Sequence, residues 1–253
     1  MNGRANWHVP GYAVAYSWLA RDYLSNLEMI LVLLHESLAT LLVVGTAPAI
    51  RGVLMKCAHP FRSGDCYRID ALDSEVLNEL MQHPAVEPSA RWLVHRPWMQ
   101  PILQQRYGIV PSGFGIRGFA TTTASTIPRD GRPLGGADRA LVEWSDCGWS
   151  AADFDQLLQG RRPWAIVHDD LIICRASAGY DTPWTAEVLG LWTHPAYRKR
   201  GLARSLVAAI CDDILARKPI AAYSTTFENL ASQHVARAVG LKHVTTITEC
   251  TPG

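Results

Sequence analysis

Three consecutive basic residues stand directly before a glycine in the second half of the chain. They are Arg198, Lys199 and Arg200, and Gly201 is followed by the apolar-rich segment 202–218. A glycine lets the backbone approach a bound group closely, and the first N–H groups of a helix carry a partial positive charge that binds phosphate. The basic side chains add attraction over a longer range. This spacing predicts a pyrophosphate-binding site where a strand passes into a helix.

The elements that must position this loop are predicted from hydrophobic periodicity. Residues 186–193 favour a strand that leads into the basic loop, and leucine and isoleucine recur one turn apart in a helix over 201–218. Around them the sequence predicts a helix at 150–160, a hairpin of strands at 164–168 and 171–177, a strand at 220–226, a helix at 229–239 and a strand at 243–248. The order from residue 150 onwards is α-β-β-β-α-β-α-β.

Together with this order of elements, the basic loop resembles the GNAT superfamily of acyl-CoA-dependent N-acyltransferases. The signature of that family, Gln/Arg-x-x-Gly-x-Gly/Ala, is matched by Arg198, Gly201 and Ala203. A second block, Asn229-x-x-Ser232 with Val-Gly-Leu at 239–241, is similar to the next motif of the family. The resemblance covers residues 139–250 and implies an α/β (α+β) GNAT fold with a mixed, mainly antiparallel central sheet. Its Asn-x-x-Ser and Thr-x-Pro-x-x-Arg patterns are loosely similar to the zwittermicin-resistance acetyltransferases.

The resemblance implies acetyl-CoA as the cosubstrate and no metal. The main chain of residues 191–193 would pair with the pantetheine arm, the amides of 199–204 would hold the pyrophosphate, and Asn229 would contact the pantetheine or adenosine side. A main-chain N–H near Leu191 or Trp192 would stabilise the oxyanion. The expected cofactor-binding residues are Leu191, Trp192, Thr193, Arg198, Lys199, Arg200, Gly201, Leu202, Ala203, Arg204, Asn229 and Ser232.

Glu187 is the expected general base. It lies eleven positions before Arg198, the offset at which several GNAT enzymes place a general base. An amine nucleophile is mostly protonated at neutral pH, so a carboxylate must take its proton directly or through water. The alternative is a strand glutamate that is merely solvated.

The sequence departs from the family pattern at Ala236. Many GNAT enzymes carry there, seven residues after the Asn, a Tyr that protonates the departing thiolate. Tyr223, Ser232 and His234 are nearby candidates, and the first two join Glu187 as expected catalytic residues. The alternative for Tyr223 is an aromatic packed against the core, and for His234 it is a surface or packing position. For Ser232 the alternative is a small residue needed beside the cofactor. A thiol pKa of about 8.5 also lets the thiolate leave unassisted.

A segment rich in small polar residues, Pro and Gly over 121–138 divides the chain. We expect an N-terminal α/β region at 1–125 and a GNAT domain at 136–253. The first region favours a helix over 17–38, strands at 39–44, 52–55 and 91–95, and helices starting near Asp73 and Pro97. It is interpreted as a substrate-binding cap or as a degenerate copy of the same fold, with the cap slightly preferred. Its GxGxxG pattern at 113–118 lacks a surrounding βα unit and indicates a glycine-rich turn.

Composition excludes several classes of function. Twenty-four basic against 23 acidic residues give a net charge of +1, which argues against a nucleic-acid-binding surface. The six cysteines form no zinc-site spacing. The N-terminus lacks the pattern of a secretory leader, and the most apolar stretch is too short and interrupted to cross a bilayer. We expect a cytoplasmic protein with reduced thiols and no membrane partner; a homodimer is left open.

These observations predict an N-acetyltransferase that moves an acetyl group from acetyl-CoA to an amine of a small molecule by direct attack in a ternary complex. Two alternatives remain. One is a peptide or protein N-acyltransferase, and the other is a non-catalytic acyl-CoA-binding sensor, which the missing Tyr at position 236 keeps open.

Overall fold

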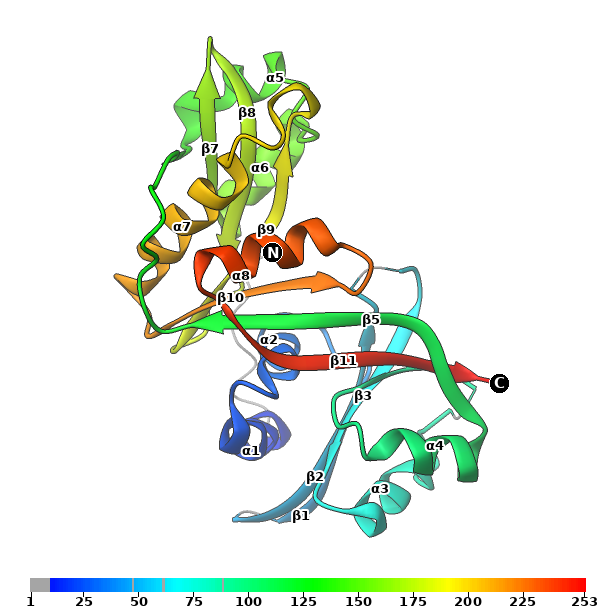
Figure 1. Ribbon diagram of the computed structural model, residues 1–253. Helices are drawn as coiled ribbons and strands as arrows, with labels where there is room; N and C mark the ends of the chain where they lie inside the picture. The colour runs from blue at the N-terminus through cyan, green and yellow to red at the C-terminus, as the bar shows by residue number, and fades with distance from the viewer. Residues whose placement is uncertain (1–9, 47, 61, 88) are drawn as a thin grey trace. The chain divides into compact units, whose positions relative to one another are not determined.

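The computed structural model describes residues 10–253 except 47, 61 and 88. Residues 1–9, to which the prediction about a secretory leader applies, lie outside the described residues. The chain forms two compact units (Figure 1). The second unit is Gly118–His243, and the first unit comprises the described residues up to Arg117 together with Val244–Gly253. Two strands, β5 (Ile109–Thr121) and β11 (Lys242–Pro252), contain the boundary between the units.

The second unit has the mixed, mainly antiparallel sheet expected of the GNAT fold. Its strand order is β5-β10-β9-β8-β7-β6, in which β9 and β10 run parallel, while the β6–β7, β7–β8 and β8–β9 pairs are antiparallel. Besides β5, its elements are β6 (Arg132–Pro133), α5 (Arg139–Trp144), α6 (Ala151–Gly160), β7 (Arg162–His168), β8 (Leu171–Gly179), β9 (Thr185–Thr193), α7 (Leu202–Leu215), β10 (Ile220–Thr226) and α8 (Leu230–Val239), with short 3-10 helices at Gly136–Asp138 and Pro195–Tyr197.

Local signals in the sequence set the boundaries of these elements. Asp169 and Asp170 both adopt left-handed backbone angles (φ 49° and 57°) in the two-residue hairpin between β7 and β8, as the strand twist requires. Ser150 and Asp153 form the predicted capping box at the start of α6. At the end of α8, Gly240 adopts φ 96° and closes the helix. The predictions for this part of the chain are confirmed to within a few residues.

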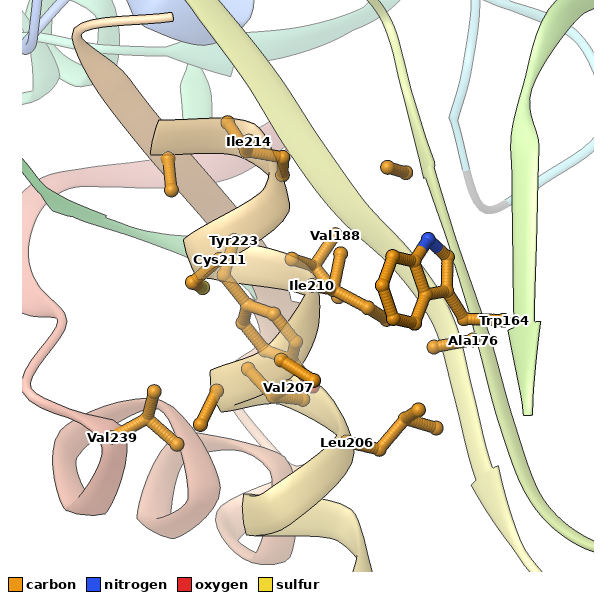
Figure 2. Close-up of a cluster of buried hydrophobic side chains, with 14 of the residues drawn as sticks. Trp164, Ala176, Val188, Leu206, Val207, Ile210, Cys211, Ile214, Tyr223 and Val239 are labelled. Carbon is orange, nitrogen blue, oxygen red and sulfur yellow. The ribbon is translucent and has the colours of Figure 1, made fainter. Parts of the chain in front are cut away.

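Helix α7 packs its apolar face on one side of this sheet (Figure 2). Leu206, Ile210 and Ile214 are fully buried and face Trp164 and Val188 of the strands. Burial of one such side chain contributes about 1.5–3 kcal/mol. Helices α5 and α6 contact β8 and β7 and form a second apolar cluster. The second unit is therefore a helix–sheet–helix sandwich in which α7 contacts β9 directly.

Strand β9 changes course at Gly190. Its register with β8 shifts between the pairs Ser177↔Leu189 and Arg175↔Trp192, and Gly190 at this point adopts φ 61°. A bulge of this kind bends a strand and alters which way its groups point. The parallel register of β9 with β10 ends at Val188 and Tyr223. The second half of β9 is therefore free of that ladder and leads to the basic loop.

The first unit repeats the order of elements seen in the second. It contains α1 (Pro10–Leu19), a 3-10 turn at Ala20–Asp22, α2 (Leu27–His35), β1 (Thr40–Thr46), β2 (Ala49–Ala58), β3 (Asp65–Ala71), α3 (Ser74–Met81), β4 (Arg91–Val94) and α4 (Met99–Tyr107). Its sheet order is β1-β2-β3-β4-β11, with β3 and β4 parallel and its other pairs antiparallel. In both units the order is α-α-β-β-β-α-β-α, and the parallel pair occupies the same place.

Two predictions for the first unit are wrong. The helix expected over 17–38 is interrupted between Leu19 and Leu27. In this interruption the buried Asn26 side chain donates to the Leu19 carbonyl at 3.1 Å and to Asp70 at 3.3 Å. Short amides compete with the helical backbone for hydrogen bonds in this way. The glycines of 113–118, expected in a turn, lie within β5. There Phe114 and Ile116 alternate with Gly113 and Gly115 at the period of a strand.

Candidate active site

A cleft of about 720 Å³ lies in the second unit between the end of β9, the basic loop, and helices α7 and α8. It brings together every residue expected to bind the cofactor except Arg200, which is not part of its wall. Tyr197 and His234 also line it. The full lining is Leu191, Trp192, Thr193, Tyr197, Arg198, Lys199, Gly201, Leu202, Ala203, Arg204, Asn229, Ala231, Ser232, His234, Val235 and Ala238.

The basic loop forms a backbone cradle at the start of α7. Lys199 (φ 62°) and Gly201 (φ 84°) both adopt left-handed angles on either side of Arg200, and successive N–H groups in such a turn converge on one point. No side chain caps α7, whereas Ser150 and Asn229 cap α6 and α8. The first N–H groups of α7 are thus available to an anion.

Cationic side chains surround this cradle and are held by backbone carbonyls. Arg198 Nε donates to the Thr193 carbonyl at 3.1 Å. Arg200 donates to the Ala196 carbonyl at 3.1 Å, and its guanidinium lies 5.0 Å from the centre of the Tyr197 ring. Among the described residues, no carboxylate forms an ion pair with the cations of this loop. Their charge therefore remains available to a phosphate in the cleft.

The hydroxyl groups of Tyr223 and Ser232 are hydrogen-bonded to each other at the wall of the cleft. Tyr223 is 3% exposed. Burial raises the pKa of Tyr223 and outweighs the opposite effect of the Ser232 hydrogen bond. Ser232 itself lines the cleft, so the pair connects a protonated phenol to the cleft. Ala236 is fully buried in the core of this unit and not part of the wall.

Glu187 lies on β9, three residues before Gly190, and is 5% exposed. Ser224 Oγ on β10 donates to Glu187 Oε1 at 2.5 Å. Its neighbours Ala186 and Val188 belong to the core under α7, so Glu187 points to the opposite face of the sheet. Glu187 and Tyr223 do not line the cleft. The sequence did not indicate Ser224, because the register between β9 and β10 is set by the folded sheet.

No group of three or more His, Cys, Asp or Glu side chains in the described part of the chain could hold a metal ion. In the same residues, no helix is long and apolar enough to cross a membrane.

The backbone cradle at the start of α7, with cationic side chains around it, is suited to a phosphate-bearing ligand. Residues 150–248 match the family model of the GNAT acetyltransferases. This segment is a GNAT domain, and the family is one of acyltransferases. No sequence match to a curated protein was found.

Solved structures share the fold over most of the chain. A GCN5-related N-acetyltransferase from Kribbella flavida is 13% identical, with a TM-score of 0.57 over 100% of this chain and 97% of that one. A GNAT-family acetyltransferase from Colwellia psychrerythraea is 12% identical, with a TM-score of 0.56 over 83% and 84%. A tandem GNAT protein from the clavulanic acid biosynthesis pathway is 12% identical, with a TM-score of 0.52 over 94% of each chain. At these identities the likeness concerns the fold alone.

Proposed function

We propose that this protein is an N-acetyltransferase that moves an acetyl group from acetyl-CoA to an amine of a small molecule. The observation that carries the proposal is the cleft of the GNAT domain, in which the cradle at α7, the free edge of β9 and Ser232 of α8 face one space. The cradle suits the pyrophosphate and the edge of β9 suits the amide-bearing pantetheine arm. Holding both substrates in one complex supplies much of the rate by alignment.

In the proposed mechanism, Glu187 takes a proton from the ammonium form of the acceptor, directly or through water. The neutral amine then attacks the thioester carbon, and a main-chain N–H of residues 191–192 stabilises the oxyanion. When the carbon–sulfur bond breaks, the thiolate accepts a proton from the Tyr223–Ser232 pair. The hydrogen bond between these hydroxyls and the high pKa of Tyr223 support this role.

The experiment that tests the proposal mixes the protein with acetyl-CoA and a panel of amines of different size and charge. Thiol release measures turnover, and mass spectrometry of the amine detects a gain of one acetyl group. We expect at least one small amine to be acetylated in a protein-dependent way. Acetylation of peptides alone would favour the peptide or protein N-acyltransferase alternative.

A specific observation favours a second candidate, a non-catalytic acyl-CoA sensor. The position at which many relatives carry the thiolate-protonating Tyr is Ala236, and it is buried away from the cleft. A sensor would bind acetyl-CoA in the same cradle and acetylate no amine. The thiol-release experiment separates these two readings.

We infer that the first unit is a degenerate copy of the GNAT domain without an acyl-CoA cleft. Its helix α3 corresponds in order to α7 but is capped by Asp73, whose carboxylate accepts from the Val76 N–H at 3.0 Å. Strands β2 and β3 pair from Gly52↔Ala71 to Ala58↔Asp65 with no shift in register. An ion pair of 2.8 Å between Asp70 and Arg96 joins the segments that follow the β3–β4 pairing. A carboxylate at the helix start disfavours a phosphate. Such a copy can also serve as a cap for the acceptor.

A further inference from the structure

Arg175, in the middle of β8, holds the bulge of β9 from the neighbouring strand. Its Nη1 donates to the carbonyl of Gly190 at 2.5 Å, and its Nε donates to the carbonyl of Cys147 at 2.8 Å. The guanidinium lies 4.7 Å from the centre of the Trp149 ring and 5.9 Å from that of Trp192. Two carbonyls and two aromatic faces thus fix the orientation of this half-buried cation.

The surrounding backbone is shaped to admit this guanidinium. Gly148 and Gly190 both have left-handed angles, with φ of 72° and 61°. A Cβ atom at these positions would lie 3.1 Å and 3.3 Å from the guanidinium nitrogens of Arg175. Within the described residues Arg175 takes part in no ion pair with a carboxylate, and burial lowers its pKa. Its positive charge is therefore directed at the two carbonyl oxygens and the two aromatic rings.

The carbonyl of Gly190 belongs to the same peptide group as the N–H of Leu191, and Leu191 lines the cleft. A hydrogen bond from a cation to a peptide oxygen draws electrons toward that oxygen and makes the N–H of the same group a stronger donor. A donor that is fixed before the reaction stabilises developing negative charge without reorganisation. The contact thus links a charge on β8 to the point on β9 where the thioester oxygen would lie.

We propose that Arg175 is a positioning residue that fixes the β9 bulge and polarises the Gly190–Leu191 peptide group, so that the Leu191 N–H stabilises the oxyanion of the acyl transfer. This inference rests on the proposed function. In that reaction the amine nitrogen forms a bond to the thioester carbon, and the carbonyl electron pair moves to oxygen. The pair returns as the carbon–sulfur bond breaks, and the thiolate takes a proton from the Tyr223–Ser232 pair. Glu187 already holds the proton of the ammonium form, so the second proton that the nitrogen loses on becoming an amide returns to the Tyr223–Ser232 pair through water.

The test compares Arg175→Gln, which removes the charge, with Arg175→Lys, which keeps it. Arg162→Gln is the matched control, because Arg162 is also a strand arginine but is ion-paired with Asp213 at 3.0 Å on the surface. Three quantities are measured: the Kd of CoA, which has no acyl group, the infrared carbonyl band of bound acetyl-CoA labelled with carbon-13, and kcat. The first two need no acceptor amine.

We expect the wild-type protein and the control to shift the carbonyl band to lower wavenumber on binding. Arg175→Gln should lose most of this shift and lower kcat by about tenfold to a hundredfold, while the Kd of CoA changes less than threefold. Arg175→Lys should retain part of the shift. If Arg175→Gln folds poorly, the shift measured in Arg175→Lys still tests the role of Arg175.

A wild-type carbonyl band in both variants would overturn the role of Arg175 and leave the proposed function standing. A loss of CoA binding in parallel with the loss of the band in both variants would also overturn it, because Arg175 would then only support the fold. Failure of the wild-type protein to bind acetyl-CoA would overturn the proposed function, and the role of Arg175 with it.

Discussion

At the scale of single residues, Glu187 is the general base in the proposed mechanism, and its carboxylate is buried. It accepts a hydrogen bond from Ser224 and lies on β9 three residues before Gly190. We expect Glu187→Gln to lower kcat by about 10²- to 10⁴-fold, because the amide cannot accept the proton of the acceptor. The Kd of acetyl-CoA should stay the same, as Glu187 does not line the cleft.

The matched control for this variant is Glu143→Gln. Glu143 is an exposed carboxylate on α5 that is ion-paired with Arg139 at 3.1 Å. Steady-state thiol release with a reactive amine gives kcat, and calorimetric titration gives the Kd. Unchanged turnover in Glu187→Gln would show that another group takes the proton.

Tyr223 and Ser232 should act as one unit. We expect Tyr223→Phe and Ser232→Ala each to lower kcat by about tenfold or more, and the double variant to be no slower than the slower single variant. Because burial raises the pKa of Tyr223 above its ordinary value of 10.0, the rate should not fall through this group below about pH 10. The measurement is kcat against pH for all four proteins. Independent, multiplying losses would contradict a shared role.

At the scale of elements, the left-handed turn before α7 is the feature on which the proposed cofactor site depends. An alanine at φ 84° in place of Gly201 costs about 1–2 kcal/mol and displaces the N–H groups of the cradle. We expect Gly201→Ala to weaken acetyl-CoA binding by about tenfold, with a smaller effect on S-acetylpantetheine, which lacks the pyrophosphate.

Gly240→Ala provides the control for this strain. Gly240 also adopts a left-handed angle, φ 96°, and it follows α8 outside the cleft. Gly240→Ala should lower the free energy of unfolding by about as much as Gly201→Ala does, and it should leave the Kd of acetyl-CoA unchanged. Equal losses of affinity in both variants, measured by calorimetry, would argue against a special role for the turn at Gly201.

In the first unit, a buried ionic cluster joins helix α2 to strand β3. Arg68, 1% exposed, lies 2.8 Å from Glu28, which also lies 3.3 Å from His95. Burial raises the pKa of Glu28, but the charge of Arg68 and the His95 contact outweigh this and lower it from 4.5 to about 2. The folded state thus favours ionised Glu28. The resulting stabilisation is present above pH 4.5 and is lost as the pH falls towards 2.

We therefore expect Glu28→Gln to lower the free energy of unfolding by about 3–5 kcal/mol at neutral pH, because it leaves Arg68 buried and unpaired. The difference from wild type should narrow as the pH falls below 4.5. Urea unfolding between pH 7 and pH 3 measures it, with the exposed Glu75→Gln as control. A difference that does not depend on pH would contradict this account.

Elements that depend on local rules could be predicted from the sequence, whereas elements that depend on contacts between distant residues could not. In the second unit, the capping box at Ser150, the Asp169–Asp170 turn and the helix of 201–218 each depend on local rules, and the structure confirms them. Strand β3 was not predicted, because its Arg68 and Asp70 read as surface residues. Both are buried, and their charges are paired with residues distant in sequence.

In the candidate site, too, the residues of local motifs were predictable and the contacts between strands were not. The basic loop and Asn229 were indicated by motif and spacing, and Arg198, Lys199 and Asn229 line one cleft. The contacts of Ser224 with Glu187 and of Arg175 with Gly190 join different strands. They depend on sheet register and on the bulge, which only the folded chain defines.

At the scale of the whole molecule, the two units repeat one order of elements, which supports the inference that the first unit is a degenerate copy of the second. The second unit keeps an uncapped helix start with four nearby cations, at positions 198, 199, 200 and 204. In the first unit, the corresponding helix α3 starts with Asp73 as its cap and Glu75 in its first turn. Negative charge at this point opposes a pyrophosphate. The molecule should therefore bind one acyl-CoA in each chain.

Calorimetric titration of the full chain with acetyl-CoA, repeated with S-acetylpantetheine, tests the central claim most directly. We expect one binding site in each chain and a much weaker interaction, by about 100-fold or more, for the analogue without pyrophosphate. Two equivalent sites would contradict the inference that the first unit has no acyl-CoA cleft. Equal affinity for both compounds, or no binding of acetyl-CoA, would contradict the assignment of the α7 cradle as the pyrophosphate site.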